Sequence, residues 1–409
     1  MKKVIVLQNS PVFTVDITNI YKPDAWELHL ILNQKSYDCL CKRDQQDLLA
    51  SIKITEDFSF DSLKNNIDFI IINTPRKHLV LATNTESLIA VTGQLRDYFT
   101  IPGMSERIAM LFSDKIHMKN HLSKLSVPLP KYCYFDKNEY VNSANEYLDK
   151  LCQQISFPII SKPIDSAGCH GVNKIHDRVE LEKWASMMEH CNFELDEYIE
   201  GELYHCDSFV HQGNILYTVI CRYSFPAHQF LLGKNLGSII LANNDPRYQK
   251  LKKFNDDILK NMSTDFNGVT HLEVFEKNDG QLVFLEVANR GGGAGIPKIY
   301  NKYLGIDLFS THFLLQCDDN YQFDIHQGAY AAWLQFTPCS NVTSLEHLPS
   351  IKSEINLIFK NKKINSNSIC TSLRDYSLLI MLWNDDVVQL QQDFNKLSIY
   401  RNQLPPMVF

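Results

Sequence analysis

Apolar residues form short runs over the first hundred positions, and polar segments separate these runs. Four runs have the length of a β-strand, and they lie at 4–7, 27–32, 67–72 and 78–82. A helical pattern follows between residues 85 and 98. Apolar strands that alternate with helices are typical of a parallel sheet covered on both faces. The pattern predicts an α/β domain over residues 1–100, without the Gly-x-Gly-x-x-Gly sequence of a dinucleotide site.

The rest of the chain changes from helical to mainly β. After the breaker Thr100-Ile101-Pro102-Gly103, we expect one helix over 105–112 and a second, capped by Ser113, that runs to about residue 125. Later strands are expected at 157–162, 193–199, 206–211, 215–223, 330–336 and 377–382, with a final helix at 385–400. The breaker predicts a domain boundary near residue 100, in a chain whose length fits two or three domains.

One predicted hairpin forces two carboxylates together. Asp-Gly at 279–280, between two alternating apolar runs, predicts a two-residue turn. That register sets Glu273 opposite Glu286, an arrangement that destabilises a sheet unless a hard divalent cation binds both carboxylates. We therefore predict a metal site, and we expect Glu286→Gln to spare folding because it relieves repulsion. Two solvated glutamates, or a three-residue turn with another register, are the alternatives.

Composition and charge restrict the class of protein. Apolar residues make up 44% of the chain, and 40 Lys and Arg against 47 Asp and Glu give a net charge of −7. A soluble globular protein is expected, with no overall attraction to nucleic acid or anionic membrane. The 11 cysteines form no Cys-x-x-Cys pair, which predicts reduced thiols in a cytoplasmic protein. No apolar stretch approaches the ~20 residues of a membrane span.

Two lysines stand where they could meet phosphate. Lys162 ends an apolar strand, and the small residues after it include Gly168 and Gly171, whose backbone N–H groups can approach phosphate oxygens. Lys115 follows Asp114 at the start of a predicted helix. The segment lacks the Walker sequence Gly-x4-Gly-Lys-Ser/Thr. Taken singly, the glycine-rich piece is explained better by a surface turn with a solvated lysine, and Lys115 can be a solvent-facing helical lysine.

The order of these motifs is specific. Asp114-Lys115, then Lys162 with its glycine-rich segment, then Asp-Glu-Tyr-Ile-Glu-Gly at 196–201, then Glu273, Glu286 and Arg290 resembles the ATP-grasp superfamily. Within it, the chain looks like the carboxylate–amine ligases of the L-amino-acid (dipeptide) ligase branch. The resemblance covers about residues 100–316. It implies an α/β and α+β ATP-grasp fold, with an N-terminal Rossmann-like domain over residues 1–100, a small lid domain over 101–195 and a larger antiparallel sheet domain over 196–409.

The resemblance also implies roles for individual residues. It implies ATP contacts from Lys115, Lys162, Ser166, Gly168, His170, Gly171, Asp196, Glu197, Ile199 and Glu202. It implies magnesium ligation by Glu273 and Glu286, and stabilisation of an acyl phosphate by Arg290. His271, His205 or a carboxylate would take the proton of the amine. Further expected pocket residues are His205, Asp207, Gly292 and Gly293, followed by Arg222, Tyr223 and Lys234.

Two positions depart from the pattern of the superfamily. Ala288 stands where many members have a metal-binding Asn, and Asn289 comes one residue later. Leu203 stands at the usual ribose glutamate, which Glu202 precedes. The first departure lowers the expected number of metal ligands.

The implied reaction activates a carboxylate with ATP as an acyl phosphate, which an amine then attacks to give an amide, ADP and phosphate. The implied cofactors are ATP and Mg²⁺, with Mn²⁺ as a substitute, and the partners are small carboxylates and amines, amino acids among them. A homodimer is the default assembly for such enzymes. The alternatives are a synthetase that activates bicarbonate or formate, a nucleotide-binding scaffold without catalysis, and a nicotinamide oxidoreductase.

Overall fold

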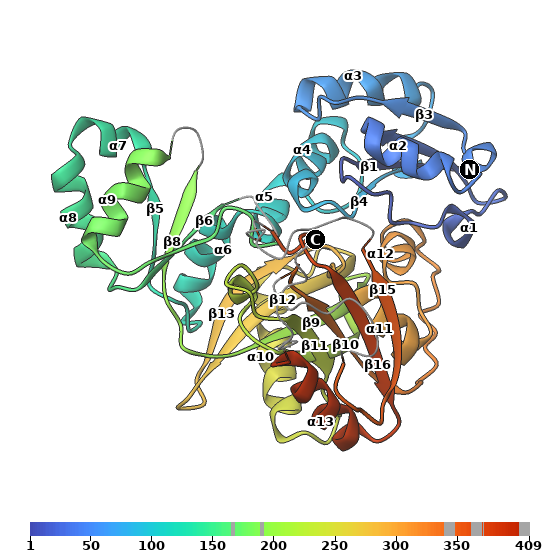
Figure 1. Ribbon diagram of the computed structural model, residues 1–409. Coiled ribbons are helices and arrows are strands. Elements are labelled where there is room, and N and C mark those ends of the chain that lie inside the picture. The colour runs from blue at the N-terminus through green and yellow to red at the C-terminus, as the bar shows by residue number, and fades with distance from the viewer. Residues whose placement is uncertain (165–167, 189–191, 339–347, 361–369, 371, 401–409) are drawn as a thin grey trace, which may run out of the picture.

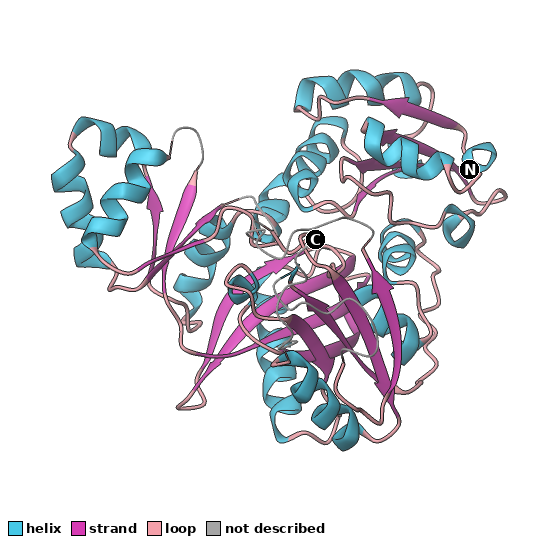
Figure 2. Cartoon of the chain, in the orientation of Figure 1, coloured by secondary structure: helices cyan, strands magenta, loops and turns pink. Residues whose placement is uncertain are grey.

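Three sheets organise the chain (Figures 1 and 2). The computed structural model describes residues 1–164, 168–188, 192–338, 348–360, 370 and 372–400. The N-terminal sheet has strand order β3-β2-β1-β4, a small sheet has the order β5-β8-β6-β7, and an eight-stranded sheet has the order β13-β12-β9-β10-β11-β14-β16-β15. This architecture confirms the expected fold class. Within the described residues, no helix combines the length and apolarity needed to cross a membrane.

The N-terminal sheet is parallel, as predicted, and apolar clusters cover both of its faces. Its strands are β1 (Lys2–Gln8), β2 (Trp26–Leu32), β3 (Ser51–Ile54) and β4 (Leu79–Thr83). Its helices are α1 (Ile17–Ile20), α2 (Gln34–Cys41), α3 (Phe60–Ile70) and α4 (Ile89–Phe99).

The strand expected at 67–72 is wrong, because most of this run lies in α3. The Ser59 side chain caps the helix by accepting the Ser62 N–H, and Leu63 and Ile67 are the helix residues buried at a spacing of four. A continuous apolar run cannot distinguish a buried strand from the end of a helix.

A small sheet with three helices forms the unit at the left of Figure 1. Its strands are antiparallel: β5 (Tyr132–Phe135), β6 (Ile159–Pro163), β7 (Asn173–Ile175) and β8 (Phe193–Glu197). Its helices are α7 (Lys137–Asn142), α8 (Ala144–Gln154) and α9 (Arg178–Met187). The expected boundary at 195/196 falls inside β8, so we propose that this domain ends after Glu197.

Two helices lead from the N-terminal unit to the small sheet: α5 (Glu106–Ala109) and α6 (Lys115–Leu122). The cap of α6 is Asp114, whose side chain accepts the His117 N–H, and not Ser113 as expected. Ser113 instead donates its hydroxyl to the Ala109 carbonyl. The Asp114 cap sets Lys115 as the first residue of the helix.

The large sheet is antiparallel, and the C-terminal segment extends it. Its strands are β9 (Gly201–His211), β10 (Asn214–Tyr223), β11 (Leu236–Ile240), β12 (Gly268–Lys277), β13 (Leu282–Ala288), β14 (Tyr330–Phe336), β15 (Glu354–Phe359) and β16 (Leu378–Asn384). Its helices are α10 (Pro246–Met262), α11 (Ile296–Leu304), α12 (Leu308–Cys317) and α13 (Val387–Ser398). β14, β15 and β16 therefore continue the sheet that carries Glu273 and Glu286.

Candidate active site

The two glutamates of the β12–β13 hairpin lie directly opposite each other, as predicted. The turn that joins the strands differs from the prediction. Lys277 donates its backbone N–H to the Gln281 carbonyl at 2.9 Å, and Gly280 adopts a φ of +84°. The loop therefore has three residues and ends on a left-handed glycine, which alone would shift the register by one.

A β-bulge restores the register. Val274 pairs with Phe284, whereas Glu273 pairs with Glu286, so Leu285 is an extra residue on β13. Without the bulge, Leu285 would stand opposite Glu273. Leu285 and Glu286 both line the same cavity. The predicted pairing is thus correct because two departures from the expected geometry cancel.

A cavity of about 830 Å³ opens between the small and the large sheet. It brings together most of the expected ATP and metal residues: Lys115, Lys162, Gly168, His170, Asp196, Glu197, Ile199, Glu273 and Glu286. Apolar walls come from Ile160, Leu203, Phe275 and Phe284. A few polar groups in an apolar cleft are typical of a small-molecule site.

Two of the expected ATP residues, Gly171 and Glu202, do not line this cavity. Ser166 lies outside the described residues. Gly171 has a φ of +74°, and a Cβ there would lie 2.9 Å from Cγ of Pro163, so its role is to let the backbone pack. Glu202 is half exposed and pairs with Arg222 at 3.3 Å and Arg247 at 3.2 Å. The next strand position, Leu203, lines the cavity, so the geometry does not support Glu202 as a ribose contact.

Lys115 reaches the metal-site glutamate from α6. Its Nζ lies 3.5 Å from Oε2 of Glu286 and 3.9 Å from Oε1 of Glu86, and the side chain is buried. Burial opposes its charge, but Glu286 and Glu86 outweigh burial and raise the pKa of Lys115. Lys115 is therefore a cation at neutral pH.

Lys162 approaches the same glutamate from β6. Its Nζ lies 3.9 Å from Oε2 of Glu286, 2.9 Å from Oδ2 of Asp196 and 3.3 Å from Oε2 of Glu194. These carboxylates raise the pKa of Lys162 well above its usual value despite burial. Burial also disfavours the charge of Glu286, but the two lysines lower its pKa to about 2. The three side chains form a charged cluster at the cavity wall.

Sequence reasoning missed three charged residues beside this cluster: Glu86, Lys119 and Glu194. Lys119 is one helical turn after Lys115, and Glu194 is two strand positions before Asp196, so each shares a face with a predicted residue. Those spacings could have identified both. Glu86 follows β4 in the N-terminal unit, and no local pattern links it to the site.

Arg290 is held by the N-terminal unit. Its Nε donates to Oε2 of Glu86 at 2.7 Å, and one of its terminal nitrogens donates to the Gly291 carbonyl at 3.0 Å. The Gly291 N–H donates to the side chain of Asn84 at 2.9 Å. Asn84 and Glu86 follow β4 at the carboxyl end of the parallel sheet, where such sheets bind ligands. Arg290 does not line the cavity, but it lies beside Gly291 at the end of the same hairpin.

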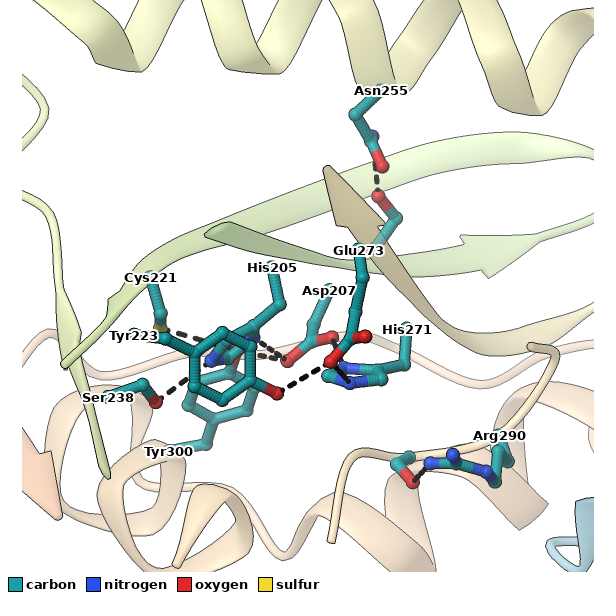
Figure 3. A network of polar contacts seen from close by, with 12 residues as sticks. His205, Asp207, Cys221, Tyr223, Ser238, Asn255, His271, Glu273, Arg290 and Tyr300 are labelled. Atoms are coloured by element: carbon teal, nitrogen blue, oxygen red, sulfur yellow. Dashed lines mark hydrogen bonds and ion pairs between the residues drawn. The ribbon is translucent and has the colours of Figure 1, made fainter. Parts of the chain in front are cut away.

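A buried network lies on the other side of Glu273 (Figure 3). Asp207 of β9 accepts hydrogen bonds from three side chains: Nδ1 of His271 at 2.5 Å, Nδ1 of His205 at 3.0 Å and the hydroxyl of Tyr300. Nε2 of His205 lies 2.9 Å from the Ser238 hydroxyl. Atoms of His205, Asp207 and His271 lie within 4.8 Å of one another, a donor set that could also hold a metal ion.

The network holds Glu273 and influences the charge of His271. Oε1 of Glu273 accepts the Tyr223 hydroxyl at 2.9 Å and lies 3.6 Å from Nε2 of His271. Burial alone would lower the pKa of His271, but Asp207 and Glu273 raise it to about 10. The two carboxylates therefore favour the protonated ring of His271, which in that form donates hydrogen bonds. A cation bound to Glu273 would remove part of this effect.

Three of the remaining expected pocket residues, Gly292, Gly293 and Lys234, have different surroundings. Gly292 is required by packing, because a Cβ would lie 2.7 Å from Cδ1 of Ile296 and 3.2 Å from Nδ1 of His271. Gly293 is exposed and a Cβ there meets no atom within 4 Å. Lys234 does not line the cavity, and its Nζ lies 4.4 Å from the centre of the Phe225 ring.

Asn289 and Arg222 form hydrogen bonds outside the cavity. Nδ2 of Asn289 donates to the carbonyls of Asn267 and Val269, and Asn289 does not line the cavity that holds Glu273 and Glu286. Arg222 binds Glu202 and also Asn395, and it does not line the cavity.

Comparisons with known proteins identify the domain that carries most of these residues. Residues 155–298 match the family described as "ATP-grasp domain". An L-arginine-specific L-amino acid ligase of Bacillus subtilis is 27% identical over 339 residues, which covers 77% of each chain. The structure of an L-amino acid ligase from Bacillus licheniformis has a TM-score of 0.70 at 14% identity and covers 98% of this chain and 99% of that one. N5-carboxyaminoimidazole synthetase from Staphylococcus aureus, complexed with ADP, has a TM-score of 0.67 at 14% identity and covers 96% of each chain.

Proposed function

We propose that this chain, which carries an ATP-grasp domain, is an ATP-dependent ligase that joins a carboxylate to an amine through an acyl phosphate. One observation carries the proposal: Lys115 and Lys162 converge on Glu286, which stands opposite Glu273, at the wall of one cavity. Two cations beside two opposed carboxylates suit a triphosphate with a divalent cation.

The residues present fit magnesium. Glu273 and Glu286 offer carboxylate oxygens, the ligands that Mg²⁺ prefers, and the two side chains stand opposite each other across the hairpin. Magnesium bound there would neutralise charge on the phosphate oxygens. Tyr223 orients Glu273 by its hydrogen bond, and the ion pairs with Lys115 and Lys162 orient Glu286. In this proposal Glu286 exchanges part of its lysine contact for the cation, and the lysines turn to the phosphates.

Each neighbouring residue then has a distinct task. Lys115 and Lys162 bind the phosphates of ATP, while Gly168 and His170 lie on the segment that closes over them. The apolar wall formed by Leu203 and Phe275 receives the base and excludes water, which would hydrolyse an acyl phosphate.

Arg290 binds the substrate carboxylate or the oxyanion that develops on it. Glu86 orients the Arg290 guanidinium through the bond to Nε, and the Gly291 carbonyl accepts from one terminal nitrogen, which leaves the second terminal nitrogen for the substrate. In its protonated form His271 donates a hydrogen bond rather than taking a proton, so we assign the deprotonation of the amine to a carboxylate, to His205 or to solvent.

Amino acids are the proposed substrates. The support is the similarity over 77% of the chain to a protein named as an L-arginine-specific L-amino acid ligase. The arginine specificity in that name belongs to that protein. We therefore propose the class, an α-amino acid as the carboxylate and a second amino acid as the amine.

The test measures phosphate release from MgATP with single amino acids and with all pairs of the twenty, and identifies products by mass spectrometry. We expect release that depends on an amino acid pair, together with a dipeptide of matching mass. Release with bicarbonate or formate alone would instead support a synthetase for those acids. ATP binding without turnover would support a scaffold, and a change in NADH absorbance would support an oxidoreductase.

A further inference from the structure

Two fully buried carboxylates lie directly behind the phosphate-binding wall. Glu194 and Asp196 occupy alternate positions of β8, on the same face of the strand, and their exposed fractions are 0% and 2%. Lys162 pairs with both from β6. Two buried carboxylates carry two negative charges, and one lysine cannot neutralise them. Buried charges persist only when they are paired.

Lys119 supplies the second positive charge. Its Nζ lies 2.6 Å from Oδ1 and 2.7 Å from Oδ2 of Asp196, and 2.7 Å from Oε1 of Glu194. These contacts are shorter than those of Lys162 to the same two carboxylates, which are 2.9 and 3.3 Å. Lys119 has an exposed fraction of 0% and does not line the cavity, whereas Lys162 and Asp196 do. It therefore cannot touch a nucleotide in the cavity.

Lys119 and Lys162 both pair with Glu194 and Asp196, but of these two lysines only Lys162 lines the cavity. Lys119 is enclosed between the acidic pair and the Tyr132 ring, whose centre lies 5.5 Å from its Nζ, while Lys162 also faces the cavity and approaches Glu286. If Lys119 were neutral, both carboxylates would act on Lys162 alone. The ammonium of Lys162 would then be overcompensated, and an incoming phosphate would meet net negative charge.

We propose that Lys119 is a positioning residue for nucleotide binding, which neutralises Glu194 and Asp196 so that the charge of Lys162 remains available to a phosphate. This inference rests on the proposed function, because it assumes that Lys162 binds a nucleotide phosphate. It adds a residue that does not contact the nucleotide. It also gives a sign rule: removing a positive charge behind Lys162 weakens nucleotide binding, and removing a negative charge there strengthens it.

The sign rule separates this role from a purely structural one. Lys119→Met should weaken nucleotide binding, because Lys162 then faces two carboxylates by itself. Glu194→Gln should strengthen binding, because it removes a competitor 3.3 Å from the Lys162 ammonium. The double variant restores the charge balance and should bind nearly as well as the wild type. If Lys119 only supports the fold, removing either partner should weaken binding.

The experiment measures the affinity of the full chain for magnesium AMP-PNP by calorimetry, with a thermal unfolding curve for every variant. We expect Lys119→Met to weaken binding about tenfold, which corresponds to about 1.4 kcal/mol. We expect Glu194→Gln to bind at least as tightly as the wild type, and the double variant to lie within about threefold of it. Lys252→Met, which removes a partly buried ion pair with Asp256 on α10, away from the cavity, is the matched control.

Different results point to different failures. A wild type that does not bind magnesium AMP-PNP refutes the proposed function. A wild type that binds, with a folded Lys119→Met variant of equal affinity, refutes only the role of Lys119. If Lys119→Met does not fold, Glu194→Gln and the double variant decide, and weaker binding in Glu194→Gln refutes the proposal.

Discussion

Glu286→Gln removes the residue on which the two phosphate-site lysines converge. The sequence suggested that this change would spare folding, because it relieves repulsion with Glu273. The structure reverses that expectation, since Lys115 and Lys162 lie 3.5 and 3.9 Å from Oε2 of Glu286. These lysines lower its pKa from the ordinary 4.5 to about 2, against the effect of burial. That difference corresponds to about 3 kcal/mol of stability at neutral pH.

The pH dependence follows from the sign of this change. A carboxyl whose pKa is lower in the folded state stabilises the fold above its unfolded pKa of 4.5, and loses this effect as the pH falls through about 2. The gap in stability between wild type and Glu286→Gln should therefore be full at pH 7 and about half as large at pH 3. The same variant should lose ATP turnover at every pH, because it removes a metal ligand.

Urea denaturation, followed by tryptophan fluorescence, measures this gap. With a slope of about 3 kcal/mol per molar urea, the midpoint should fall by about 1 M at pH 7. Glu276→Gln is the matched control on the same hairpin, because Glu276 pairs with the half-exposed Lys250 at 2.8 Å, a contact worth about 0–1 kcal/mol. Equal midpoints for the two variants at pH 7 would show that the lysines do not stabilise Glu286. Retained turnover in Glu286→Gln would refute the metal assignment.

Three further predictions concern Arg290, the glycines that follow it, and the buried His312. Arg290→Ala should leave magnesium AMP-PNP affinity intact and abolish amide product, measured by calorimetry and mass spectrometry; a normal yield of product would contradict its role. Gly292→Ala should lower stability by about 1–3 kcal/mol, because its Cβ meets Ile296 at 2.7 Å, whereas Gly293→Ala has open space and should cost little. Burial lowers the pKa of His312 to about 4, and its Nδ1 accepts the Val269 N–H. The stability advantage of the wild type over His312→Asn should therefore shrink as the pH falls from about 6.5 to about 4, and a gap that does not change with pH in urea titrations would contradict this.

Local chemistry made part of this site predictable. Side chains alternate along a strand, so one hairpin places Glu273 and Glu286 on one side from the sequence alone. The same reasoning placed Lys162 at the end of a strand and Lys115 at the start of a helix. It gave the wrong turn, and the error had no effect only because Leu285 bulges from β13. The size of a hairpin loop and the position of a bulge depend on how the whole sheet twists and packs.

Contacts between distant segments were not predictable. Asp196 lies 77 positions from Lys119, and Glu86 lies 204 positions from Arg290. By sequence, Lys119 is an ordinary helical lysine, and only the packing of α6 against the small sheet buries it. The strand wrongly expected at 67–72 has the same origin, because an apolar run shows that a segment is buried but not what it packs against.

The sequence by itself determined the order of the motifs and the change from a parallel α/β unit to mainly β structure, because strand and helix periods are properties of neighbouring residues. The fold class followed from the family resemblance that those motifs carry, and the predicted opposition of Glu273 and Glu286 held only because of the bulge at Leu285. The tertiary structure alone decided which charges neutralise one another: Glu86 with Arg290, Lys119 with Asp196, and Glu286 with two lysines. Coulomb energy depends on distance and on exclusion of water, and folding sets both of these between residues that the sequence keeps far apart.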